Sequence, residues 1–192
     1  DLNLGENKVE NAAFSLSYFK LKMDSLQAGK IKKVNILQIG DSHIQPDNFS
    51  GEIRRQLQKQ YGNGGRGLIF PYNLAKTNGP KDYTASSNTT WSNSWITHFK
   101  QKFKIGFPGI GMQSETDAGT IDFNMTKDSI KSPYIKAFVV YSMEPSSMGT
   151  ITLNNQVTKN NSGLLFDTIC IQLKKEQTTL KVEFKDTKLT FH

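Results

Sequence analysis

Apolar side chains follow a helical pattern near the start of the chain. Between residues 12 and 26 they recur at spacings of three and four, which predicts an amphipathic helix that ends at Gly29. The first apolar stripe consists of Leu16, Phe19, Met23 and Leu26. A second stripe holds Phe14, Tyr18 and Leu21, so we expect neighbouring segments to cover this helix on two sides.

The next segment has a continuous apolar pattern. VNILQIG, residues 34–40, is apolar on both faces, which predicts a strand of a parallel sheet covered by helices. A turn and helix cap follow at 46–48, and residues 49–61 repeat an apolar side chain every fourth position, which predicts a second helix. At Gly62 the sequence GNGGRG indicates a tight, open loop before LIFPY. The first third of the chain therefore reads as α/β.

The rest of the chain carries β-type patterns. Residues 73–94 are rich in Asn, Thr, Ser, Lys and Gly without a period, which predicts a loop or domain boundary. Short β-rich runs follow: FKIGFPGIG, TIDFNM, YIKAFVVYS, GTITL, QVTK, LLFDTICIQL, TLKVEF and KLTFH. Residues 180–185 alternate strictly, and Asn154-Asn155 fits a two-residue hairpin turn.

Short strands at this spacing are typical of an antiparallel sandwich or jelly roll. We therefore predict two parts: an α/β portion over residues 1–85 and an antiparallel β-sandwich over residues 86–192. A chain of 192 residues is long enough for one ordinary core or two small ones.

Charge and composition narrow the function classes. The chain has 24 Lys and Arg against 17 Asp and Glu, a net charge of +7, which suits either an anionic partner or simple solubility. The basic residues are scattered and form no nucleic-acid-binding motif, so we expect no nucleic acid partner. No run of about 20 apolar residues occurs, so we expect no membrane span.

Metals and cofactors are not indicated either. The histidines are widely separated and Cys170 is alone, whereas zinc needs clustered ligands. Cys170 lies in the apolar run FDTICIQL, which predicts a small buried thiol. The glycines of GNGGRG lack the Lys-Ser ending of a phosphate loop, so we expect a structural turn and no cofactor.

The candidate chemistry lies where the predicted strand ends, at Gly40-Asp41-Ser42-His43. In α/β folds the carboxyl ends of strands carry the sites, and an exposed serine there becomes a nucleophile when a histidine removes its proton. Asp41 is expected to brace the turn through backbone hydrogen bonds. The alternative interpretation is that Asp-Ser-His only caps a turn after a strand.

Residues 12–72 resemble the SGNH (GDSL-type) hydrolases, and most closely the branch that contains the peptidoglycan O-acetylesterases. In that branch Gly-Asp-Ser-His replaces Gly-Asp-Ser-Leu, a glycine-rich loop follows the helix, and a sandwich similar to a carbohydrate-binding module is inserted. The resemblance implies a flavodoxin-like hydrolase domain with Ser42 as nucleophile and its backbone N–H as an oxyanion donor. Gly40, Asp41 and His43 would belong to the same block without being the base.

The resemblance also implies an activity. The parent protein would be a serine esterase that removes acyl groups, acetyl above all, from a carbohydrate polymer such as peptidoglycan. It would act in the bacterial periplasm or outside the cell.

The chain departs from the family in the remaining blocks. The blocks that carry the oxyanion-hole Gly and Asn are not recognisable. The Asp-x-x-His block is also missing, because the residues three before His43, His98 and His192 are Gly40, Trp95 and Leu189. Either the chain is the front portion of a longer hydrolase, or it has lost catalysis. Too few strands follow Ser42 to complete a parallel sheet, which favours the first explanation. We expect these residues alone to be catalytically silent, with the edge of VNILQIG open for pairing with another copy.

Aromatic and histidine residues elsewhere offer weaker candidates. Trp91 and Trp95 in TTWSNSW suit either sugar stacking or edge packing of the sandwich. His98 is a candidate base, but a lone histidine between aromatic and basic neighbours is more often structural. His192 is expected to fray at the end of the chain. The alternative function is a non-catalytic polysaccharide-binding or interaction module.

Overall fold

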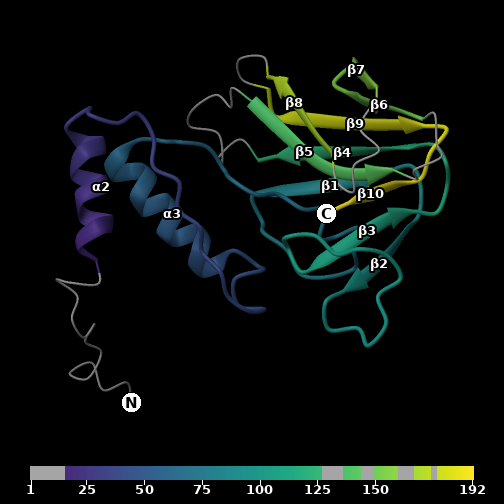
Figure 1. Cartoon of the computed structure of the whole chain (residues 1–192), viewed down its shortest axis with the longest axis horizontal. Helices are drawn as coiled ribbons and strands as arrows, with labels where there is room; N and C mark the ends of the chain where they lie inside the picture. The colour runs from purple at the N-terminus through teal and green to yellow at the C-terminus, as the bar shows by residue number, and fades with distance from the viewer. Residues whose placement is uncertain (1–15, 127–135, 144–148, 160–166, 174–176) are drawn as a thin grey trace.

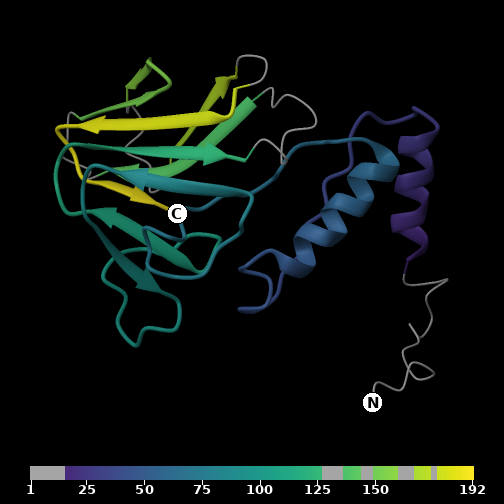
Figure 2. The same cartoon turned by 180° about the vertical axis from the view of Figure 1, so that it is seen from behind.

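The computed structural model describes residues 16–126, 136–143, 149–159, 167–173 and 177–192. Among these residues, two helices lie at one end of the molecule and ten strands form a two-sheet assembly at the other end (Figure 1). Figure 2 shows the same arrangement from behind. No helix in the described ranges is long and apolar enough to cross a membrane.

The first predicted helix is confirmed over α2 (Ser17–Gln27), and residues 12–15 lie outside the described part. Met23 is the buried residue of this helix. Tyr18 and Leu21 of the second stripe are exposed, so the expectation that the helix is covered on two sides is wrong. α2 contacts α3, and nothing covers its other face among the described residues.

The second predicted helix is confirmed as α3 (Asn48–Tyr61). Asp47 precedes it in a left-handed conformation, with φ of 60°, and its carbonyl oxygen accepts a hydrogen bond from Gly51 N at 2.9 Å. The Asp47 side chain makes no capping bond to the helix backbone, because it is engaged by arginine side chains. The helix ends at Gly62, as the sequence indicates.

The segment VNILQIG does not form the predicted strand. Residues 33–40 are neither helix, turn nor strand, and the ten described strands all belong to the two antiparallel sheets. A strand exists only through hydrogen bonds to a neighbouring strand, and no described strand lies beside this segment. The flavodoxin-like portion therefore stays a prediction.

The predicted antiparallel sandwich is confirmed. One sheet has the order β1 (Tyr83–Ser87), β4 (Gly119–Met125), β9 (Thr179–Lys185), β6 (Thr150–Leu153), β7 (Gln156–Lys159). The other has the order β2 (Trp91–Trp95), β3 (Ile110–Ser114), β10 (Leu189–Phe191), β5 (Lys136–Met143), β8 (Asp167–Gln172). Every pairing is antiparallel.

The strand order is that of a jelly roll. The eight strands β3 to β10 form two sheets of four, β3-β10-β5-β8 and β4-β9-β6-β7, so most neighbours are distant in sequence. β1 and β2 add one edge strand to each sheet. Apolar side chains from both inner faces make one core, to which Trp91, Met112, Ile121, Tyr141 and Phe184 contribute. Every member of this core lies between residues 70 and 191.

Two strands lie where the composition predicted a loop. β1 (YTASS) lies within residues 73–94 and β2 (WSNSW) lies there except for its last residue, Trp95; β1 also spans the boundary that we placed between residues 85 and 86. Their inward positions carry large apolar groups such as Tyr83 and Trp91, while small polar residues occupy many of the others. Pairing with β4 and β3 therefore overrides the weak strand propensity of Ser and Asn.

Candidate functional site

Ser42 lies in a turn that the Asp41 side chain braces. The Asp41 carboxylate oxygen Oδ1 accepts a hydrogen bond from His43 N at 2.9 Å and lies 2.9 Å from His43 Nδ1. The backbone closes the turn, since Ile44 N donates to Asp41 O at 3.0 Å. The backbone N–H of His43, and then its ring, hold the pKa of the Asp41 carboxyl below its usual value. The predicted bracing role of Asp41 is confirmed.

Gly40 is needed where the apolar segment meets this turn. A Cβ at this position would lie 2.5 Å from Ile44 Cγ1, because the turn folds the Ile44 side chain over the glycine. Ser42 itself is exposed. The Ser42 hydroxyl is therefore held at the surface by a turn that Gly40, Asp41, His43 and Ile44 form around it.

A base is not assembled beside Ser42. The His43 ring is bound to Asp41, His98 Nδ1 accepts a hydrogen bond from Trp95 N at 3.4 Å, and His192 Nε2 lies 2.6 Å from Ser142 Oγ. These are the three histidines of the chain. The described residues thus supply a serine hydroxyl and its turn, but no histidine hydrogen-bonded to it.

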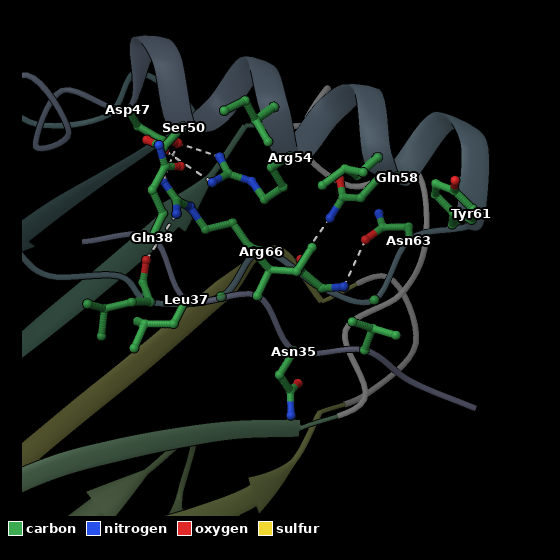
Figure 3. A pocket seen from close by; sticks show the side chains of 18 of the residues that line it. Asn35, Leu37, Gln38, Asp47, Ser50, Arg54, Gln58, Tyr61, Asn63 and Arg66 are labelled. Carbon is green, nitrogen blue, oxygen red and sulfur yellow. Dashed lines mark hydrogen bonds and ion pairs between the residues drawn. The ribbon is translucent and has the colours of Figure 1, made fainter. Parts of the chain in front are cut away.

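A groove of about 640 Å³ opens next to the turn (Figure 3). It is lined by residues 32–38, one face of α3 and the glycine loop 62–67. Ile44 and Gln45 bring the Ser42 turn to its edge, whereas Ser42 does not line it. Apolar side chains of the 34–37 segment and of α3 alternate with polar groups such as Asn35, Gln38, Gln58 and Asn63.

The glycine loop that borders this groove is held by side-chain hydrogen bonds. Gln58 Nε2 donates to Gly65 O at 2.8 Å, and Asn63 Oδ1 accepts from Gly65 N at 2.9 Å. Gly62, Gly65 and Gly67 have φ values of 95°, 112° and 84°, which residues with a Cβ rarely adopt. The loop is therefore fixed by two amide side chains and by glycine conformations.

An ion cluster joins the Ser42 turn, α3 and the glycine loop to the start of β1. Arg66 Nη2 lies 3.0 Å from Asp47 Oδ2 and 3.1 Å from Asp82 Oδ1, and the Arg66 side chain is only 8% exposed. Arg54 binds the same Asp47 carboxylate with both terminal nitrogens. The Arg66 guanidinium also stacks over the Tyr83 ring at 5.1 Å.

Burial acts to raise the pKa of the Asp47 carboxyl, but hydrogen bonds from Arg54 and Ser50 and the charge of Arg66 outweigh it, so this pKa lies below its usual value. Tyr83, behind Arg66, exchanges two hydrogen bonds with the Phe70 backbone, and burial raises its pKa to about 12. Sequence reasoning missed this cluster. Arg66, at its centre, is 19 residues from Asp47 and 16 from Asp82, so no local pattern could have found it.

The Gln45 side chain makes a second set of hydrogen bonds that hold the Ser42 turn in place. Gln45 Nε2 donates to Thr77 Oγ1 at 2.8 Å and to Asn78 O at 2.5 Å. Gln45 is three residues after Ser42, and residues 77–78 lead into β1. The turn is therefore anchored to the chain that enters the sandwich.

The two tryptophans have different environments. Trp91 is 9% exposed, lies against Phe184 and Phe191 with ring centroids 5.8 and 5.7 Å away, and donates from Nε1 to Ser87 Oγ. The packing role that we weighed against sugar stacking is therefore confirmed for Trp91. Trp95 is only partly buried, with Nε1 3.2 Å from Asn93 Oδ1, and its contact with sugar stays a prediction.

Two other expectations are wrong. Cys170 is exposed, because the alternation of β8 turns Ile169 and Ile171 into the core and Cys170 outward. His192 does not fray, because it is 8% exposed and packs against Gly106 and Ser142.

The arrangement supplies an exposed, braced hydroxyl beside a groove that apolar and amide groups line. Within the described ranges, no group of three His, Cys, Asp or Glu side chains could hold a metal ion. No family model matches the chain, and a search of curated proteins finds no match.

Proposed function

We propose that this chain carries the nucleophile turn and the β-sandwich of a serine ester hydrolase that acts on an acylated carbohydrate polymer such as peptidoglycan. The observation that carries the proposal is the exposed Ser42 on a turn braced by Asp41, directly before α3 and beside the groove. The resemblance of residues 12–72 to SGNH hydrolases supports the same chemistry. The polymer would be met in the bacterial periplasm or outside the cell.

In this reaction Ser42 Oγ attacks the acyl carbonyl carbon while a base takes the hydroxyl proton. The Ser42 backbone N–H donates to the developing oxyanion, the C–O bond to the sugar breaks, and the base returns the proton to the sugar oxygen. Water then hydrolyses the acyl-serine by the same steps. The proposal places the base and the further oxyanion donors in polypeptide outside these 192 residues, because the three histidines here are bound elsewhere.

The experiment compares a longer product of the same gene, reaching an Asp-x-x-His block, with its Ser42→Ala variant on a chromogenic acetyl ester. We expect Ser42→Ala to lose activity by several orders of magnitude, because no other group here replaces the nucleophile. Ser25→Ala, at a partly buried serine of α2 whose hydroxyl donates to the Leu21 carbonyl oxygen, is the matched control and should keep the parent rate. Equal rates for Ser42→Ala and the parent would overturn the assignment.

The alternative function is a non-catalytic polysaccharide-binding or interaction module. What favours it is that no histidine is hydrogen-bonded to Ser42, whereas the described residues of the sandwich share one buried core. Sedimentation with insoluble cell-wall glycan separates the two proposals. Binding that Trp95→Ala weakens, without esterase activity in the longer product, would favour the module.

A further inference from the structure

The segment that leads to Ser42 leaves its backbone unpaired and three of its large apolar side chains exposed. Residues 33–40 contain no helix, turn or strand, and in the described part of the chain no backbone hydrogen bond is made between 34 and 40. Ile36, Leu37 and Ile39 are 51%, 65% and 80% exposed. Water can hydrogen-bond to the backbone groups, but exposing three large apolar side chains to water is unfavourable in free energy.

This exposure is concentrated in the N-terminal part. Of the fourteen exposed large apolar side chains of the described residues, eight lie between residues 16 and 49. An apolar segment with free N–H and C=O groups is a template for another extended strand, which satisfies the backbone and covers the side chains at once.

The charges at the two ends of the segment favour a second copy as that strand. Lys32 and Lys33 stand at its start, and Asp41 stands at its end with an exposed carboxylate. In an antiparallel pair centred on Leu37, Lys33 of each copy lies opposite Asp41 of the other. A parallel pair of copies in register would instead place lysine beside lysine and aspartate beside aspartate, which is unfavourable.

We propose that the 192-residue chain forms a two-fold dimer in which residues 33–41 of two copies pair antiparallel, with Leu37 facing Leu37. The interface is isologous, so each favourable contact away from the axis occurs twice. Val34 then lies opposite Gly40, and Asn35 opposite Ile39. The dimer goes beyond the proposed esterase function and concerns these 192 residues as they stand, because in a longer hydrolase the flavodoxin-like sheet would cover the same segment.

The first test is the mass of the purified chain in solution, measured by light scattering during size exclusion and by sedimentation velocity. We expect a dimer, twice 21.6 kDa, that dissociates on dilution. A monomer at every concentration would overturn the proposal.

Charge exchange tests the register. Lys33→Asp and Asp41→Lys should each raise the dissociation constant roughly tenfold or more, because each creates two like-charge pairs, and the double variant should restore dimerisation. Lys30→Asp, just outside the paired stretch, is the matched control and should behave as the parent. A dimer that none of these changes weakens would lie elsewhere on the surface and would refute the assignment.

Crosslinking gives a readout that does not depend on charge. In a Cys170→Ser background, Leu37→Cys should form an intermolecular disulfide, because the two Cα atoms at the axis come within about 4.5–5.5 Å. Ile39→Cys faces Asn35 and should crosslink much more slowly. Residues 37 and 39 lie outside the core of the sandwich, so both variants should keep the parent's tryptophan fluorescence. Equal crosslinking at both positions would contradict the register.

Discussion

At the scale of single residues, the His192 side chain is buried by neighbouring segments, and this burial changes its pKa. His192 follows β10 and lies between Ser142 of β5 and the loop at Lys104 and Gly106, where even a Cβ on Gly106 would collide with it. Burial, with a smaller contribution from the Lys104 charge, lowers its pKa from about 6.5 to about 4. The folded protein therefore holds this ring neutral.

This lowered pKa predicts acid sensitivity of the sandwich. Between pH 6.5 and 4 the unfolded chain binds a proton that the folded chain does not, so the free energy of unfolding falls as the pH falls through this window. The full contribution is about 3 kcal/mol at most. Urea denaturation at several pH values should show this slope, and His192→Gln should flatten it. An unchanged slope in His192→Gln would refute the assignment.

At the scale of elements, the ion cluster connects α3, the glycine loop and the start of β1. Arg66 in the glycine loop is almost fully buried and binds two carboxylates, whereas Arg55 of α3 is exposed and, among the described residues, pairs with Glu52 three residues away. Removing the buried Arg66 cation takes one ion-pair partner from both Asp47 and Asp82 and leaves them only Arg54 within the described cluster, while an exposed pair contributes little.

We therefore expect Arg66→Met to lower the free energy of opening of α3 by about 2–4 kcal/mol, since Asp47 and Asp82 lose a shared cation. Hydrogen exchange of the α3 amides measures this opening. Arg55→Met is the matched control and should change it by less than about 0.5 kcal/mol. Similar losses of protection in both variants would mean that the cluster does not anchor the helix.

At the scale of the whole molecule, the buried core belongs to the sandwich. Its buried members lie between residues 70 and 191, while residues 16–67 of the described chain contribute only Met23 to the buried apolar residues. Both tryptophans of the chain are in β2, so their fluorescence reports on the sandwich alone.

A fragment of residues 68–192 should therefore unfold in urea with one cooperative fluorescence transition. Its slope with denaturant should be close to that of the full chain, because the slope follows the surface that unfolding exposes. Residues 1–67 alone should lack a cooperative transition by circular dichroism, because they bury too little apolar surface. A fragment of residues 68–192 without a transition would show that the helical part completes the core.

Most strands were predictable because their patterns are local. The alternation of residues 180–185 matches the burial of Val182 and Phe184 in β9. Asn154 and Asn155 have φ values of 45° and 67°, as a two-residue hairpin turn between β6 and β7 requires. Both α-helices were also found, since their periods extend over three or more turns.

For the candidate site, the sequence located the turn and its brace, because Gly40, Asp41 and Ser42 act within a few residues of one another. It could not locate the Arg66 cluster, whose partners meet only after the chain has folded. The esterase chemistry stays a prediction from resemblance, since its base is not among the described contacts of Ser42.

By itself, then, the sequence determined the helices, the hairpin, the alternating strands and the Ser42 turn, because each depends on neighbours within a few positions. Tertiary structure alone decided that polar YTASS and WSNSW become strands, since β4 and β3 supply their hydrogen bonds. It also decided that the apolar segment VNILQIG does not form a strand, because pairing needs a partner that local propensity cannot provide. Tertiary structure likewise decided that His192 is buried and Cys170 is exposed, since the segments that pack against a side chain set its exposure.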